Sequence, residues 1–426
     1  MSLVKESVFK QPGYNLHVVK TDKYKTNTLV WKMKAPLMRE DVTVRGLLPY
    51  ILQSSTANYP TTTKLRSYLD ELYGASFFVD LSKKGERHVM SFSVEVANEK
   101  FLKDPTPLLK KALAFLAEVV LQPNLKDGAF HTDVVEQEKK NQKQRIQSIY
   151  DDKMRFSSAR LVQEMCKGEP YALQPAGIKE EVDKMTTQDI YDYYLKAINK
   201  DELDLYVIGD VEDEEVKSIC SDLFSLSERP SQTGNTSNRK KQEEVHVVTE
   251  KQQVNQGKLN IGYRTNVTYG ERDYYALQVF NGIFGGFSHS KLFINVREKA
   301  SLAYYAASRL ESHKGLMMVM SGIDMKNYDQ AVTIIKEQMQ EMINGNFTDG
   351  ELNQTKAVIR NQLLETIDTS RGIVEVLYHN VVAKADVKLT DWLESIESIT
   401  KEEVTEVASK IQMDTIYFLT GLEGDE

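Results

Sequence analysis

Few side chains in this sequence have the type and spacing that metal or nucleophile chemistry requires. The seven histidines are spread along the chain, and the closest two, His289 and His313, are 24 positions apart. A zinc-binding helix needs two imidazoles at i and i+4, so that both reach one ion. Cys166 and Cys220 are the only cysteines, which argues against a disulfide framework and indicates a reducing compartment. The sequence predicts no metal site and no cofactor in this chain.

The segment VREKASLAYY places Arg297 and Tyr304 seven residues apart. A guanidinium and a phenol hydroxyl can both donate hydrogen bonds to the negative charge that develops on a peptide carbonyl. Seven residues also correspond to two turns of a helix, or to a helix and the strand after it, and most pairs at this spacing are structural. The spacing alone leaves the catalytic and the structural interpretation open.

The elements that would position these residues occur twice. The strand start LHVV at 16–19 recurs as VHVV at 245–248, and KLRSYLDELYGASFFV at 64–79 aligns with KLFINVREKASLAYYA at 291–306. Near the end of each copy, DKMTTQDIYDYY at 183–194 parallels ESITKEEVTEVA at 397–408. Both of these segments put a Thr at an expected helix N-cap, ahead of acidic first-turn residues. Each is followed by a strand that stops at a glycine, Gly209 or Gly421. Four matches in the same order indicate an internal duplication.

The two copies predict two homologous domains. Residues 1–228 form the first and 245–426 the second, joined by a linker at 229–244 that is rich in Ser, Thr, Asn, Gln and Lys and has no apolar period. Each copy reads as strands, then helices such as LLKKALAFLAEVVLQP, then a last helix and strand. The expected fold class is α+β, with each domain a mostly antiparallel sheet packed against helices.

Composition excludes several classes of protein. A net charge of -8 argues against a nucleic-acid surface, which needs clustered Lys and Arg for phosphates. No apolar run approaches the roughly 18 residues that a bilayer span requires. The first residues, MSLVKESVFKQPGYNLHVV, have no apolar core of a secretory signal, so we expect a cytoplasmic protein.

The segment FNGIFGGFSHSKLFINVREKASLAYYAASRLES, from Phe280, resembles the second domain of the M16 zinc metallopeptidases, the pitrilysin and mitochondrial-processing-peptidase family. The resemblance covers essentially the whole chain, including the duplicated layout. In that family the first domain carries His-x-x-Glu-His, whose two imidazoles hold Zn²⁺ while the Glu acts as base on the bound water. Aligning GLLPYILQSST puts Pro49 and Gln53 at the two His positions and Leu52 at the Glu. A later segment, VVEQEKKNQKQRIQS, puts Arg145 where the third ligand belongs, and an Arg cannot bind zinc.

The resemblance implies a role in trans. Family members that have lost the zinc motif pair with a zinc-bearing chain, and an Arg and a Tyr of their second domain face the partner's zinc. Arg297 and Tyr304 match those two positions. Gly285 and Gly286 match a Gly-rich loop that contacts substrate in such subunits, although FGGFSHS is shorter than that loop and an ordinary tight turn is an open alternative.

We therefore expect the non-catalytic subunit of a heterodimeric M16-type zinc peptidase. The partner would be a zinc-motif homologue, or a second copy of this chain, and the zinc would be bound by the partner. The substrate would be an extended peptide added to a sheet edge. Two alternatives remain open: a structural or peptide-binding homologue with no proteolytic role, and, with less support, a self-sufficient peptidase with an unfamiliar set of metal ligands.

Overall fold

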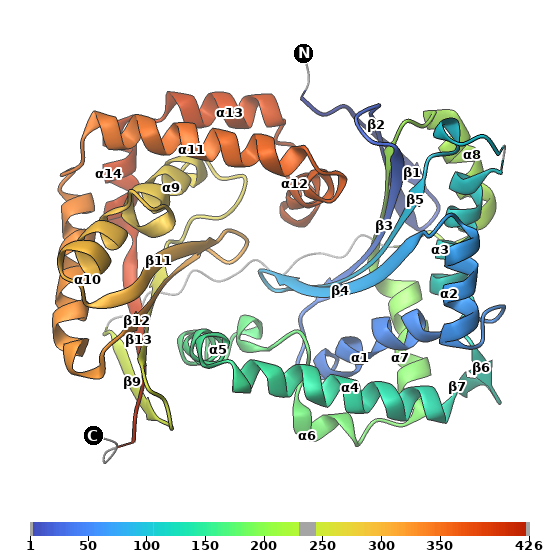
Figure 1. The fold of residues 1–426 in the computed structure, drawn as a ribbon, viewed down its shortest axis with the longest axis horizontal. Helices are drawn as coiled ribbons and strands as arrows, with labels where there is room; N and C mark the ends of the chain where they lie inside the picture. Colours follow the sequence, from blue (N-terminus) through green and yellow to red (C-terminus); the bar gives the residue numbers. More distant parts are fainter. Residues whose placement is uncertain (1–2, 105, 230–243, 423–426) are drawn as a thin grey trace.

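The computed structural model describes residues 3–104, 106–229 and 244–422 of the chain, so most of the expected linker at 229–244 lies outside the described residues. Two sheets face one another, one built from residues 6–209 and the other from residues 246–420 (Figure 1). Both are mixed but dominated by antiparallel pairs, and helices pack against them. The expected α+β class with a duplicated layout is confirmed by this arrangement.

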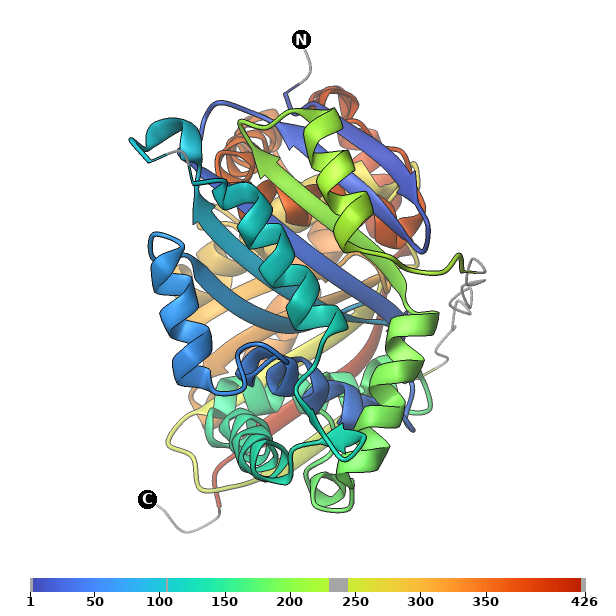
Figure 2. The same ribbon diagram turned by 90° about the vertical axis from the view of Figure 1, so that its right-hand side faces the viewer.

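The first sheet has the strand order β1-β2-β8-β3-β5-β4, in which only β2 and β8 run parallel. Alternation in β3 sends Leu29 and Trp31 toward the main core and Val30 toward the opposite face. Figure 2 shows helices of this half lying over the strands. The bounds are β1 (Glu6–Gln11), β2 (Tyr14–Lys20), β3 (Thr26–Pro36), α1 (Val42–Ser54), α2 (Thr62–Glu71), β4 (Ser76–Lys84), β5 (Arg87–Ala97), α3 (Leu108–Leu121), β6 (Leu125–Lys126), β7 (Ala129–Phe130), α4 (Thr132–Asp151), α5 (Lys153–Met165), α6 (Lys179–Val182), α7 (Thr187–Lys200), β8 (Glu202–Gly209) and α8 (Asp213–Leu223).

The second sheet has the order β11-β12-β10-β13-β9, again with one parallel pair, β13 and β9. Its own core lies between the sheet and the helices of this half. The bounds are β9 (His246–Lys251), β10 (Gly257–Arg264), α9 (Tyr274–Asn281), η3 (Gly282–Gly286), η4 (Phe293–Lys299), β11 (Ala303–Glu311), β12 (Leu316–Ile323), α10 (Tyr328–Ile343), α11 (Asp349–Ile367), α12 (Ser370–Ala383), α13 (Leu389–Ser398), α14 (Lys401–Lys410) and β13 (Gln412–Thr420).

Local signals in the repeated segments fix the helix starts. Thr186 caps α7 by accepting a hydrogen bond from the backbone N–H of Asp189 at 3.1 Å, and Thr400 caps α14 by accepting one from Glu403 at 3.2 Å. In both cases the acidic side chain bonds back to the N-cap backbone, which completes a capping box. The predicted N-caps are therefore confirmed in both halves.

One helix of each half packs against the sheet of the other half. Helix α12 of the second half packs Ile373 and Tyr378 against Tyr206 of the first sheet. Helix α5 of the first half packs Met165 and neighbouring apolar residues against Tyr417 of the second sheet. The duplication predicted helices on each sheet, but it did not predict that the inner face of each sheet is covered by a helix of the other copy.

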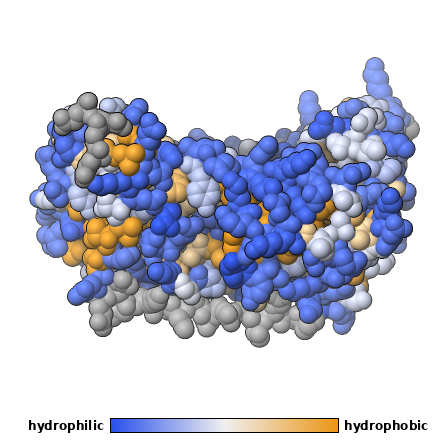
Figure 3. Space-filling view, turned by 90° about the horizontal axis from the view of Figure 1, so that it is seen from below, coloured by the Kyte–Doolittle hydropathy of each residue, from blue (hydrophilic) through white to orange (hydrophobic). Residues whose placement is uncertain are grey.

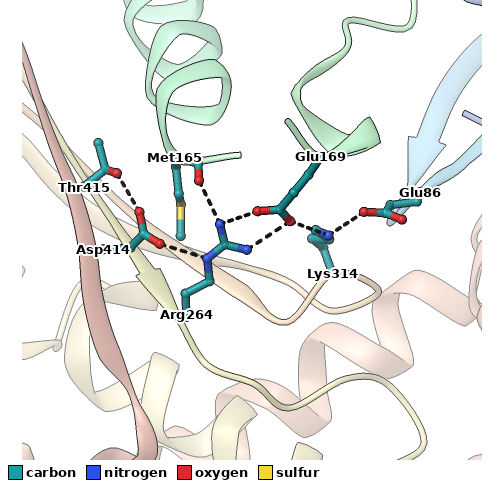
Figure 4. Close-up of polar contacts among 7 residues, drawn as sticks. All are labelled: Glu86, Met165, Glu169, Arg264, Lys314, Asp414 and Thr415. Atoms are coloured by element: carbon teal, nitrogen blue, oxygen red, sulfur yellow. Dashed lines mark hydrogen bonds and ion pairs between the residues drawn. The ribbon is translucent and has the colours of Figure 1, made fainter. Parts of the chain in front are cut away.

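A buried ionic network joins the two halves (Figure 4). The Arg264 guanidinium donates to Glu169 at 2.7 and 3.2 Å and to Asp414 at 2.9 Å. Lys314 lies 2.7 Å from Glu169 and 2.5 Å from Glu86. Burial alone would raise the pKa of Glu169, but hydrogen bonds from Arg264 and Lys314 outweigh it and hold that pKa at about 2. The network fixes the β4–β5 turn, the segment after α5 and the β11–β12 turn in one frame.

Within the residues that the structure describes, no helix combines the length and the hydropathy that a membrane crossing requires.

Candidate functional site

Arg297 lies near the end of η4, which winds as a π-helix anchored by the buried Val296. Its side chain is exposed, and the guanidinium carbon lies 4.6 Å from the centre of the Phe293 ring. The chain then turns at Ser301, whose φ of 52° lies in the left-handed region, and enters β11. This turn places η4 directly against the strand that follows it.

Tyr304 lies at the start of β11, the edge strand of the second sheet. The register of β11 against β12 shifts between Ala303 and Tyr305, so Tyr304 is the extra residue of a β-bulge. Its side chain is 76% exposed. Among the described residues, neither Arg297 nor Tyr304 makes an ion pair or a side-chain hydrogen bond. The structure thus places both predicted site residues in solvent at one edge of the second sheet, on a helix and on the strand after it.

Gly285 and Gly286 end η3, which runs along the same strand. A Cβ on Gly285 would lie 2.6 Å from Ser308 Oγ and 2.8 Å from the Ser308 backbone nitrogen. Gly286 is exposed, and a Cβ there would lie 2.8 Å from the amide nitrogen of the Asn281 side chain. Close packing against β11 accounts for the glycine at 285. Substrate contact by Gly285 and Gly286 stays a prediction.

In the first half, residues that align with the family's zinc ligands and catalytic base lie together, but their contacts are packing contacts. Helices α1 and α4 lie against one another. Pro49 and Leu52 are buried in α1, with Leu52 only 1% exposed. The Arg145 guanidinium carbon stacks 3.6 Å from the centre of the Tyr50 ring. The helices therefore meet as the resemblance predicts, with different side chains at the meeting point.

These side chains do not fit a zinc ion. Pro49 and Leu52 have no donor atom, the partly exposed Gln53 offers only a neutral amide in place of an imidazole, and Arg145 is a permanent cation. Glu138 lies 3.6 Å from Arg145, and burial raises the pKa of its carboxyl although Arg145 opposes the shift. In the described residues no group of three or more His, Cys, Asp or Glu side chains has a geometry that could hold a metal ion. No chemical step of this chain is therefore assigned to a metal of its own.

A partly buried histidine pair of the second half lies beside the β4–β5 turn of the first half, and nothing in the sequence signals it, because the two residues are 66 positions apart. His313, in the β11–β12 turn, shares a hydrogen bond of 2.7 Å with His379 of α12, and their rings stack at 4.9 Å. Gly85 of the β4–β5 turn lies so close that a Cβ there would be 2.5 Å from the His313 carbonyl oxygen. Burial lowers the pKa of His313 to about 3 and that of His379 to about 4. Both imidazoles are neutral at physiological pH.

Comparisons with known proteins agree with this geometry. The family model described as "Peptidase M16 inactive domain" matches residues 184–359. The chain is 56% identical, over the full length of both proteins, to the "Probable inactive metalloprotease YmfF" of Bacillus subtilis. A conserved protein from Enterococcus faecalis superposes with a TM-score of 0.92 at 34% identity, covering 99% of this chain and 100% of that one. A structure described as a peptidase M16 inactive domain from Pseudomonas fluorescens superposes with a TM-score of 0.82 at 16% identity, with 99% of each chain covered.

Proposed function

This chain belongs to the M16 peptidase family as an inactive metalloprotease homologue, and from that premise we propose that it is the non-catalytic subunit of a heterodimeric M16-type zinc peptidase. In this proposal Arg297 and Tyr304 hold the substrate backbone and the oxyanion at the zinc site of a partner subunit. The observation that carries the proposal is the exposure of both side chains, without an intramolecular polar partner among the described residues, at one edge of the second sheet.

The two side chains suit that role chemically. Arg297 presents a planar fork of N–H donors that matches a carbonyl or a developing oxyanion. Tyr304 presents a phenol hydroxyl on a bulged edge strand, and such bulges commonly re-aim a side chain next to an active site. Neither residue is buried: Arg297 is exposed, with its guanidinium carbon 4.6 Å from the centre of the Phe293 ring, and Tyr304 is 76% exposed.

The first half supports the same division of labour. Pro49, Gln53 and Arg145 stand at the three aligned ligand positions and Leu52 at the position of the base, so in this proposal the zinc is bound by the partner. A peptide held between the subunits would be extended and would add to an edge strand of the partner's sheet.

The deciding experiment mixes the purified chain with a homologue from the same source that carries His-x-x-Glu-His, and measures hydrolysis of unstructured peptides. We expect activity only in the mixture. Arg297→Ala lowers kcat/KM by about 100-fold, the size of effect seen when one oxyanion donor is removed. Tyr304→Phe lowers it by about tenfold, which corresponds to about 1.4 kcal/mol.

Arg272→Ala is the matched control, because Arg272 is an exposed arginine of the same half outside the proposed site. It should leave the activity of the mixture unchanged. A complex that forms without gaining activity would favour the structural or peptide-binding alternative. Equal loss of activity in Arg272→Ala and Arg297→Ala, or zinc bound stoichiometrically by this chain alone, would overturn the proposal.

A further inference from the structure

Strand β9 leaves one edge of the second sheet open. It pairs with β13 in parallel, from His246 opposite Thr415 to Lys251 opposite Thr420, and it ends the strand order. Among the described residues no strand lies along its other edge. In Figure 1 this strand lies at the lower end of the second half, and Figure 3 shows apolar patches interrupting the hydrophilic surface on that side of the lower face.

The first sheet shows how the same position is covered. There β2 makes the corresponding parallel pair with β8, and β1 runs antiparallel along its outer edge while α8 packs beside it. As a result Leu16 and Val18 of β2 are 0% and 1% exposed. In the second half Val245, just before β9, and Val247, in β9, are 40% and 55% exposed. The second sheet therefore presents the apolar strand that the first sheet covers.

An open strand of this kind is a template for pairing. Its outer row of backbone N–H and C=O groups has no ladder partner in the sheet, and β-branched side chains favour an added strand. Natural proteins usually block such an edge with a proline or with charged side chains along it. Strand β9, HVVTEK, contains no proline, and its permanent charges, Glu250 and Lys251, lie at its end, so the segment from His246 to Thr249 has none.

We infer that the open edge of β9 pairs antiparallel with β9 of a second copy of this chain. With the two-fold axis at Val248, Val248 meets its own copy, His246 lies opposite Glu250 and Val247 lies opposite Thr249. Residues directly opposite one another on neighbouring antiparallel strands point to the same face of the sheet, so the side chains of each of these pairs are in contact. The strand is thus complementary to itself in one register, with Val248 at the centre and His246 opposite Glu250 on each side. Within its own chain Glu250 also pairs with Arg160 at 3.1 Å, and His246 lies 3.6 Å from Glu164.

The two-fold arrangement also limits the assembly to a dimer. Each copy uses the same edge, so the assembly stops at two chains and joins the two second sheets into one. Strand pairing alone buries less area than a stable obligate interface, so the dimer dissociates on the order of 10 µM. This contact uses a different sheet edge from Arg297 and Tyr304 and stands independently of the proposed function.

Analytical ultracentrifugation of the full chain between about 1 and 100 µM tests the inference, with circular dichroism to confirm that each variant folds. His246 is exposed, so charge changes there spare the core. His246→Glu puts two carboxylates opposite Glu250 and raises the dimer Kd at least tenfold, whereas His246→Lys creates ion pairs and lowers it severalfold. Because Glu164 of the same chain lies 3.6 Å from His246, urea midpoints of both variants measure the part of each change that arises within one chain, and only the remaining change in Kd is assigned to cross-strand pairing.

Val8→Lys is the matched control, since Val8 is 56% exposed on β1, the open edge of the first sheet. It should leave the equilibrium unchanged. A chain that stays monomeric throughout the concentration range, a dimer that responds to Val8→Lys but not to the His246 variants, or equal effects of His246→Glu and His246→Lys would each overturn the inference.

Discussion

The α1–α4 contact and the η4–β11 edge differ in the burial of the side chains that align with the family's functional positions. In the first region Leu52 is 1% exposed within the main core, and Arg145 stacks on Tyr50. In the second region Arg297 and Tyr304 stand in solvent. Packing explains the residues of the first region, whereas in the second region the stacking of Arg297 on Phe293 leaves both side chains exposed. Where side chains align with a catalytic family, burial thus separates positions kept for stability from positions that call for another role.

The largest expected effect comes from returning a carboxylate to the first region. Leu52→Glu buries an acidic group in an apolar core and should lower the free energy of unfolding by about 3–5 kcal/mol. Urea denaturation followed by circular dichroism measures this loss. Gln53→Glu, one position along the same helix and partly exposed, is the control and should cost less than 1 kcal/mol. If Leu52→Glu were tolerated as well as Gln53→Glu, packing would not explain the first region and the comparison would break.

The second effect concerns the His313–His379 pair, which lies beside the β4–β5 turn of the first half. The pKa values of about 3 for His313 and about 4 for His379 lie below the ordinary imidazole value near 6.5. As pH falls below 6.5, the unfolded chain takes up protons that the folded chain refuses, so stability falls. Between pH 7.5 and 5 we expect a loss on the order of 2 kcal/mol, allowing for partial solvent access.

The pKa of His17 is shifted in the opposite direction, so this histidine serves as an internal reference. Burial lowers the pKa of His17, but hydrogen bonds to Asp204 and Glu6 outweigh it and raise that pKa to about 9. Its contribution is complete below pH 6.5 and is lost as pH rises through 9, so it does not change between pH 6.5 and 5. Urea midpoints at several pH values should show a shallower acid loss for His379→Gln than for the unmodified chain. An identical slope in both would contradict the assignment.

The smallest effect sharpens the second region. Gly285→Ala forces a methyl group against Ser308 and should cost about 1–3 kcal/mol of stability. Gly286→Ala meets first a movable Asn281 side chain and should cost less. Thermal unfolding of both variants measures the difference. If Gly285→Ala kept its stability but lost activity in the mixture with the partner, a substrate contact at this glycine would replace the packing account.

Sequence reasoning captured what local pattern controls. The repeat that aligns 64–79 with 291–306 has the same elements in both halves, α2 before β4 and η4 before β11, and both strands are edge strands. The sequence had left open whether Arg297 and Tyr304 lie on one helix or on a helix and the strand after it, and the structure has the second arrangement. The π winding of η4 was not predictable, because residue propensities do not distinguish it from an ordinary helix. The bulge at Tyr304 was equally hidden, since it depends on how β11 pairs with β12.

The contacts between halves lay beyond the sequence for a different reason. An amphipathic helix such as α12 shows that one face is apolar, but not which sheet that face will cover. Glu86, Glu169, Arg264 and Lys314 are too far apart in sequence for any motif to join them. The replaced ligand positions, by contrast, could be identified in the sequence, because metal binding depends on residue type as well as on position.

Because α5 packs on the sheet of the second half and α12 on the sheet of the first, the two halves are complementary fragments. A chain cut once between Arg229 and Glu244 would give two polypeptides, each lacking the helix that seals its inner sheet face and each carrying the helix that the other lacks. Each fragment exposes an apolar sheet face that the other fragment covers, so the two halves expressed as separate polypeptides should associate and regain the fold of the intact chain. After this exchange of helices each copy depends on the other for its stability, whether or not the backbone between them is continuous.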